Sequence, residues 1–111
     1  MIREFLIVAS LATPVFADPP RIVDAVADAS GTVSVTLRHG DTGWDHYADG
    51  WRVETENGDV IGTRELLHAH ENEQPFTRSL NLPGLPDEPI FIRAKCNVTG
   101  WAETRSPLTR R

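Results

Sequence analysis

The stretch "GWRVETENGDVIGTREL", from Gly50 to Leu66, decides the fold class of this chain. On each side of Asn57-Gly58, a short run of β-branched and apolar residues alternates with polar ones, which is the period of a β-strand. Asn-Gly is the strongest short hairpin signal, because a type I′ turn needs a positive φ at both of its central residues. The sequence therefore predicts an antiparallel hairpin centred on Asn57-Gly58.

Similar short segments recur along the rest of the chain from Ile22 onward, and none has a sustained 3.6-residue apolar period. Ser30-Gly31 predicts a second hairpin, and Pro107 suits an edge strand because proline has no N–H for a ladder. Strand number and spacing predict an all-β fold, a seven-stranded antiparallel β-sandwich of the immunoglobulin or fibronectin type III-like kind. The expected strands lie within residues 21–30, 32–39, 50–56, 59–66, 75–82, 89–97 and 101–109.

The N-terminal residues predict export. Residues 1–17 combine Arg3 near the start, an apolar run, and small residues at the positions that a signal peptidase reads. The apolar run is too short for a permanent membrane span, and Pro14 interrupts it. We expect a cleaved signal peptide over residues 1–17, a single sandwich domain over residues 18–111, and a periplasmic or secreted mature protein.

Charge and composition exclude several classes of function. The formal net charge of −5 argues against nucleic acid as the partner. Cys96 is the only cysteine, so no internal disulfide is possible, and a buried thiol is the expected state. No Gly-x-Ser-x-Gly elbow, phosphate loop or zincin helix occurs, so the chain is not expected to be an enzyme.

Loop positions bring all four histidines to one end of the expected sandwich. Antiparallel strands place alternate connections at the same end, here the connections "GDTGWDHYAD", "LHAHENEQ" and "NVTG". His39 and His46 lie beside or within the first of these, and His68 and His70 lie within the second. Because residues two apart in extended backbone point to the same face, His68 and His70 could reach one ion.

This cluster predicts a metal site. Imidazole with added carboxylate suits Cu²⁺ or Zn²⁺. Cys96 lacks the downstream histidine and methionine of a blue-copper loop, so a thiolate copper site is not expected. The expected ligands are His39, His46, His68 and His70, with Glu73 or Asp41 assisting.

Aromatic residues leave a different class of function open. A periplasmic protein or a glycan could bind, without any metal, to a surface formed by Trp44, Tyr47 and Trp101. Trp51, by contrast, begins a strand with Val53 on the same face, which predicts a core tryptophan. An enzyme ranks third, because no nucleophile with an adjacent base can be assigned.

The aspartates of the "DTGWDHYAD" loop have structural interpretations. Asp41 begins an Asp-Thr-Gly triplet like that of aspartic proteases, but bulky Trp44 follows it, and a carboxylate dyad would need a symmetric dimer. The spacing of Asp41, Asp45 and Asp49 does not match an EF-hand. We expect Asp41 and Asp45 to accept hydrogen bonds from loop amides as Asx turns, and Arg78 to pair with Asp45 or Asp49.

Two longer segments resemble a known family. "HGDTGWDHYADGW" together with "LLHAHENEQPFTRSL" is similar to a family of short exported bacterial proteins. The resemblance covers residues 39–80 and implies export, and it brings no particular activity with it. Relatives carry His-Gly-Trp where this chain has Thr99-Gly100-Trp101, which implies that one candidate metal ligand of the relatives is missing here.

Overall fold

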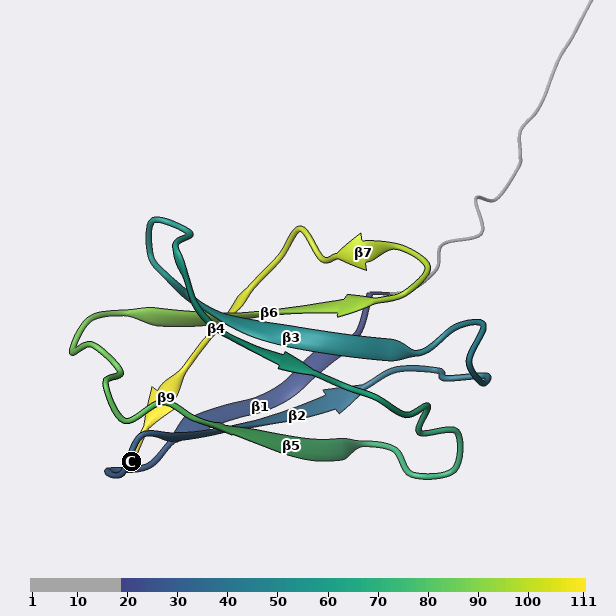
Figure 1. The fold of residues 1–111 in the computed structure, drawn as a ribbon, viewed down its shortest axis with the longest axis horizontal. Helices are drawn as coiled ribbons and strands as arrows, with labels where there is room; N and C mark the ends of the chain where they lie inside the picture. Colours follow the sequence, from purple (N-terminus) through teal and green to yellow (C-terminus); the bar gives the residue numbers. More distant parts are fainter. Residues whose placement is uncertain (1–18) are drawn as a thin grey trace, which may run out of the picture.

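The computed structural model describes residues 19–111, so the predicted signal peptide lies outside the described residues. The described part of the chain is all-β, with nine strands in two sheets that face each other (Figure 1). One sheet has the order β5-β2-β1-β9, and the other has the order β4-β3-β6-β7 with β8 also paired to β6. Within these residues, no helix has the length and apolar character needed to cross a membrane. The strands are β1 (Arg21–Ala27), β2 (Thr32–Arg38), β3 (Ala48–Thr55), β4 (Val60–Glu65), β5 (Phe76–Asn81), β6 (Ile90–Cys96), β7 (Gly100–Trp101), β8 (Ser106–Pro107) and β9 (Thr109–Arg110).

Six of the predicted strands are confirmed, and the seventh divides into three short pieces. β7 and β8 both pair antiparallel with β6 in one sheet. The chain then crosses to the other sheet, where β9 runs parallel to β1. Pro107 at the end of β8 cannot donate to a ladder, which fits the point where the chain leaves the first sheet.

Both predicted hairpins form, but the turn at Asn57-Gly58 differs from the predicted geometry. The N–H of Gly58 donates to the carbonyl of Thr55 at 2.9 Å, and Gly58 has a φ of 93°. The turn therefore ends at Gly58 instead of being centred on Asn57-Gly58, so the type I′ prediction was wrong. This is the three-residue loop in which glycine takes the left-handed position and adds a bulge. The Gly31 turn has the same pattern, with its N–H bonded to Asp28.

The core lies between the two sheets, and β2 and β6 contribute to it by alternation of buried and outward-facing residues. In β6, every second residue from Ile90 to Cys96 is buried, and β2 alternates in the same way. Trp51 is fully buried, so the predicted core tryptophan is confirmed. Cys96 is also fully buried and ends the inward row of β6 at the loop end of the sandwich.

A buried glutamate organises the outer face of the second sheet. Glu54 in β3 is 1% exposed and accepts hydrogen bonds from three arginines. Burial alone would raise the pKa of Glu54, but the arginine hydrogen bonds outweigh it and lower the pKa to about 2. Arg52 also lies over the ring of Trp101, and Arg105 over the ring of Phe91. The three donors are Arg52, Arg93 and Arg105.

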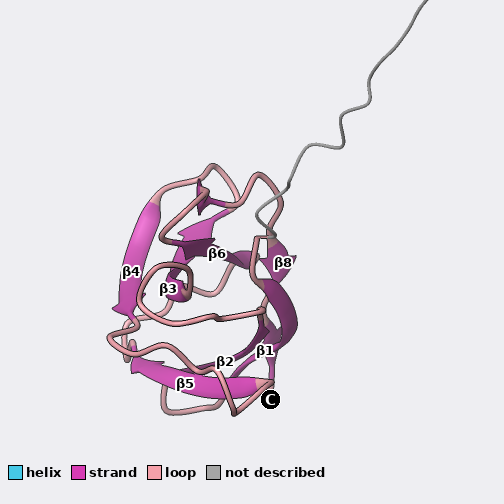
Figure 2. Ribbon diagram, turned by 90° about the vertical axis from the view of Figure 1, so that its right-hand side faces the viewer, coloured by secondary structure: helices cyan, strands magenta, loops and turns pink. Residues whose placement is uncertain are grey.

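The three loops predicted to share one end do meet. Asn97 accepts a hydrogen bond from the N–H of Tyr47 at 2.9 Å and donates one to the carbonyl of Trp44 at 3.0 Å. The N–H of His70 donates to Asp41 at 2.7 Å, which joins the β2–β3 loop to the β4–β5 loop. Figure 2 faces this end and shows the loops lying over the ends of both sheets.

Candidate metal centre

Two histidines and the cysteine form a compact group at the loop end. One ring nitrogen of His39, one of His46 and Sγ of Cys96 all lie within 4.8 Å of one another. The two imidazole rings meet edge to face, with centroids 4.8 Å apart. Donors around a tetrahedral zinc ion lie roughly 3.3–3.7 Å apart, so a contraction of about 1 Å would let all three bind one ion.

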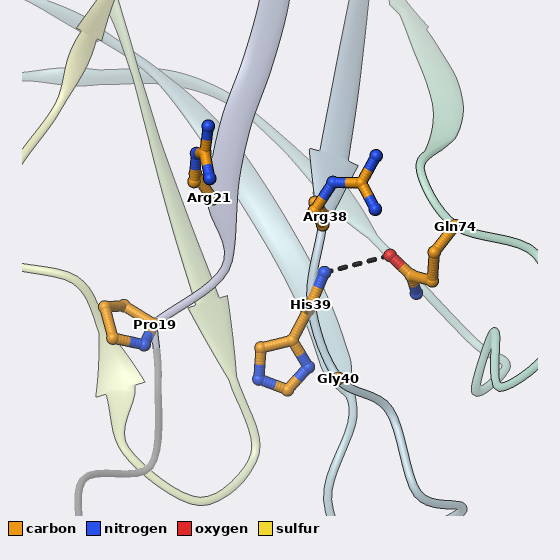
Figure 3. A pocket seen from close by; sticks show the side chains of 6 residues that line it. All are labelled: Pro19, Arg21, Arg38, His39, Gly40 and Gln74. Atoms are coloured by element: carbon orange, nitrogen blue, oxygen red, sulfur yellow. Dashed lines mark hydrogen bonds between the residues drawn. The ribbon is translucent and has the colours of Figure 1, made fainter.

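His39 is positioned by its place directly after β2 and by Gln74. Its backbone N–H donates to Oε1 of Gln74 at 2.9 Å, and Gln74 in turn donates to the carbonyl of His70. Figure 3 shows the imidazole ring pointing away from Gln74, in a pocket also lined by Pro19, Arg21, Arg38 and Gly40. The end of β2 and Gln74 therefore fix the backbone of His39, and a different residue fixes its imidazole ring.

Asp41 holds the His39 ring from inside the protein. Its side chain is fully buried, and Oδ1 accepts hydrogen bonds from Nδ1 of His39 at 2.6 Å and from the N–H of Ala48 at 3.0 Å. Oδ2 accepts from the N–H of His70 at 2.7 Å. A carboxylate on Nδ1 fixes the ring orientation, so a metal ion bound to this ring would be held by Nε2, as in carboxylate–histidine–zinc arrangements. The predicted Asx turns at Asp41 and Asp45 were wrong: Asp41 accepts N–H groups that lie 7 and 29 residues further along the chain, and among residues 19–111 the side chain of Asp45 accepts no hydrogen bond.

His46 carries an unusual buried nitrogen. Among the described residues, Nε2 of His46 has no hydrogen-bond partner although it is shielded from solvent. Buried polar atoms are nearly always hydrogen-bonded, so an unpaired one calls for a specific explanation. A metal ion on this nitrogen would provide that missing interaction.

Cys96 contributes a sulfur that is supported by polar neighbours. Its Sγ lies 3.1 Å from Oγ1 of Thr99 and accepts the backbone N–H of Thr99 at 3.4 Å. The thiolate is the form of cysteine that binds metals. Cys96 was not a predicted ligand, because the chain after it has no histidine or methionine that could join it in a copper site. The sequence did offer one signal for Cys96 as a ligand: it continues the inward-facing row of β6 and ends the strand beside the loops that carry the histidines.

The other predicted metal ligands lie outside this group. His68 is exposed, with its ring centroid 6.4 Å from that of Trp44. His70 is buried and stacks on Phe76 at 3.8 Å, and its Nε2 accepts a hydrogen bond from Arg78 at 2.7 Å. Glu73 is exposed in the same loop. Burial, together with the positive charge of Arg78, lowers the pKa of His70.

Two further expectations concern charge and aromatic contacts. The predicted ion pair of Arg78 with Asp45 or Asp49 was wrong: Arg78 bonds His70, and Asp49 pairs with Lys95 at 2.9 Å. The three aromatic residues predicted to bind a partner differ in their exposure and in their contacts. Trp44 is 66% exposed and meets Tyr47 edge to face, while Trp101 lies in β7 beneath Arg52 and Lys95.

Comparison with known proteins gives few relatives. No protein-family model matches the chain. A protein of Halomicrobium mukohataei named "Putative lipoprotein" is 53% identical over 62 residues, which cover 52% of this chain. The chain spans only 30% of that relative's length. Among solved structures, the superoxide reductase (neelaredoxin) from Ignicoccus hospitalis is similar at 18% identity and a TM-score of 0.46, over 85% of this chain and 81% of that chain.

Proposed function

We propose that this chain is a small exported β-sandwich protein that binds one divalent transition-metal ion, copper or zinc. The ligands are Nε2 of His39, Nε2 of His46 and Sγ of Cys96. The observation that carries the proposal is the buried, unpartnered Nε2 of His46 in a residue grouped with a second histidine and a buried cysteine. Metal handling or sensing is the corresponding role.

The donor set narrows the choice of ion. Two imidazoles and one thiolate suit Zn²⁺ and Cu²⁺ far better than Mg²⁺ or Ca²⁺, which prefer oxygen ligands. Three protein donors leave a fourth tetrahedral position for water or another small donor. With both histidines placed upstream of Cys96, the set no longer depends on the downstream ligands that a blue-copper loop uses.

Asp41 takes a supporting role in this proposal, because both of its oxygens already accept N–H groups. Direct ligation by His68, His70 or Glu73 stays a prediction. The exposed position of His68 makes it a suitable residue for testing that wider set without disturbing the core.

The proposals that the chain is exported and that its fold is fibronectin type III-like have separate support. The signal-like residues 1–17, the resemblance to short exported proteins and the lipoprotein name of the Halomicrobium relative all support an exported chain. The placement of β5, β2 and β1 opposite β4, β3 and β6 supports the fibronectin type III-like arrangement.

Metal content tests the proposal directly. Protein dialysed against Zn²⁺ or Cu²⁺ at neutral pH is expected to retain one ion per chain, measured by elemental analysis. His46→Ala should lose the ion, while His68→Ala, which also removes one histidine from the loop end, should keep it. Wild-type protein that retains no metal would end the proposal, and loss in His68→Ala alone would move the site to the β4–β5 loop.

Asp41→Asn is expected to weaken metal binding about 10- to 100-fold, as loss of an orienting carboxylate does elsewhere. Asparagine cannot accept all three N–H groups that Asp41 accepts, so the His39 ring loses its fixed orientation. A competition titration with a chelator measures the affinity. Asp45→Asn, the same change at an exposed aspartate of this loop, is the control and should bind like the wild type. A folded Asp41→Asn protein with wild-type affinity would exclude the orienting role.

A second candidate function uses the exposed aromatic side chain. Trp44 is 66% exposed at the loop end, and two further exposed apolar residues, Leu67 and Val98, lie in the other two loops of that end. Such residues suit a protein or glycan partner. Retention on a glycan array or in a pull-down that survives a chelator, and is lost in Trp44→Ala, would favour this function over metal binding.

A further inference from the structure

A second site lies beside the proposed metal centre, between the edge strands of the two sheets. β4 ends one sheet and β5 ends the other. A pocket of about 250 Å³ opens where these strands meet the β4–β5 loop. None of its lining residues belongs to the His39, His46 and Cys96 group. The lining residues are Arg64, Leu66, Leu67, His68, His70 and Arg78.

The two arginines of the pocket are held in place without a counter-charge. Arg64 donates from Nε to the carbonyl of Ser79 at 2.9 Å and from Nη1 to its neighbour Glu65's carbonyl at 2.6 Å. Arg78 donates from Nη1 to the carbonyl of Thr77 and from Nη2 to Nε2 of His70, both at 2.7 Å. All these partners are neutral. In the part of the chain that the structure describes, neither guanidinium forms an ion pair with a carboxylate.

His70 also lines the pocket, and one of its ring nitrogens is buried. Because Nε2 accepts the hydrogen bond from Arg78, the ring proton of neutral His70 sits on Nδ1. Nδ1 is buried and has no hydrogen-bond partner among residues 19–111. Asp41 and Glu73 lie close enough to act on the charge of His70, but neither forms an ion pair with Arg64 or Arg78. The pocket therefore holds two guanidinium groups without an ion-pair partner among the described residues, and these carboxylates offset the positive charge only in part.

Two leucines and the exposed His68 complete the lining of the pocket. Leu66 is buried at 3% exposure, and Leu67 is 64% exposed at the rim. We infer that this pocket binds a small organic carboxylate with a short alkyl chain. The carboxylate oxygens accept from the guanidinium groups of Arg64 and Arg78, a geometry that arginine favours, and the alkyl chain packs on the two leucines.

Amide NMR titration of the protein with butyrate tests this inference, with inorganic phosphate as a second probe. Butyrate is expected to shift the resonances of residues 64–70 and 78 saturably, and Arg78→Gln should weaken its binding at least tenfold. Arg38→Gln removes one exposed arginine from a different pocket and should leave butyrate binding unchanged. Saturation by phosphate without any response to butyrate would overturn the ligand class.

Leu67→Glu gives an independent variant, because Leu67 is exposed and its replacement leaves both arginine networks intact. A carboxylate at the rim should repel butyrate and lower its affinity at least tenfold. Unchanged butyrate binding in this variant, or shifts outside the pocket, would refute the site. The titration is run with and without Zn²⁺, so the result for butyrate can be interpreted even if the chain binds no metal.

Discussion

Cys96→Ser is expected to weaken Zn²⁺ binding by about 10²- to 10³-fold. Structural zinc sites bind with roughly 10–16 kcal/mol of apparent free energy, so the loss of one donor among three or four removes about 3–4 kcal/mol. Serine keeps nearly the same size and a polar contact to Thr99, but its hydroxyl does not ionise to replace the thiolate. The variant should therefore lose metal affinity while it keeps the sandwich.

Two measurements separate metal binding from folding in this variant. Affinity comes from competition with a chelator, and Cu²⁺-loaded wild type should show a thiolate charge-transfer band that the variant lacks. Zn²⁺ at 100 times its wild-type dissociation constant should stabilise the wild type by about 2.7 kcal/mol and the variant by no more than about 0.4 kcal/mol. Equal stabilisation of both proteins by Zn²⁺ would show that Cys96 is not a ligand.

Glu54→Gln is expected to lower the free energy of unfolding by about 3 kcal/mol at pH 7, the cost of breaking a buried pair from one side. The substitution leaves Arg52, Arg93 and Arg105 close together with no negative charge between them. It also loosens the contacts of Arg52 with Trp101 and of Arg105 with Phe91. The effect should spread over the outer face of the second sheet.

The loss should depend on pH in a defined direction. The folded-state pKa of Glu54 is about 2, below its usual value of 4.5, so its charge stabilises the fold fully above pH 4.5. This stabilisation is lost as the pH falls from 4.5 toward 2, and wild type and variant should converge there. Urea unfolding at several pH values measures both. Glu56→Gln, at an exposed glutamate after the same strand, is the control, and a constant difference between Glu54→Gln and wild type down to pH 2 would contradict the account.

The sequence was sufficient for the strands that have long alternating patterns. β1 to β6 and both hairpins were predicted from short segments of alternating apolar and polar residues and from glycines after short polar turns. The C-terminal segment was not resolved into its parts, because β7, β8 and β9 have two residues each and carry no period. Which sheet each piece joins depends on tertiary contacts with β6 and β1.

The sequence predicted the location of the candidate site better than it predicted which residues form it. Alternation of strand direction placed the three loops together, which the Asp41, Tyr47 and Asn97 hydrogen bonds confirm. It could not show that the ring of His70 turns onto Phe76 or that Asp41 turns inward, because loop side-chain directions follow from packing. Cys96 was visible only as a core residue, since its neighbours in space lie some fifty residues earlier in the chain.

The three-way bonding of Asp41 limits how this site could be moved to another protein. A designer who copied only residues 39–48 into a foreign sandwich would carry over His39, His46 and the carboxylate. The copy would lack the main-chain N–H of His70, which belongs to a different loop. One oxygen of the buried Asp41 carboxylate would then have no hydrogen-bond donor. A working transplant must therefore include both the β2–β3 loop and the β4–β5 loop, in the same relative positions as here.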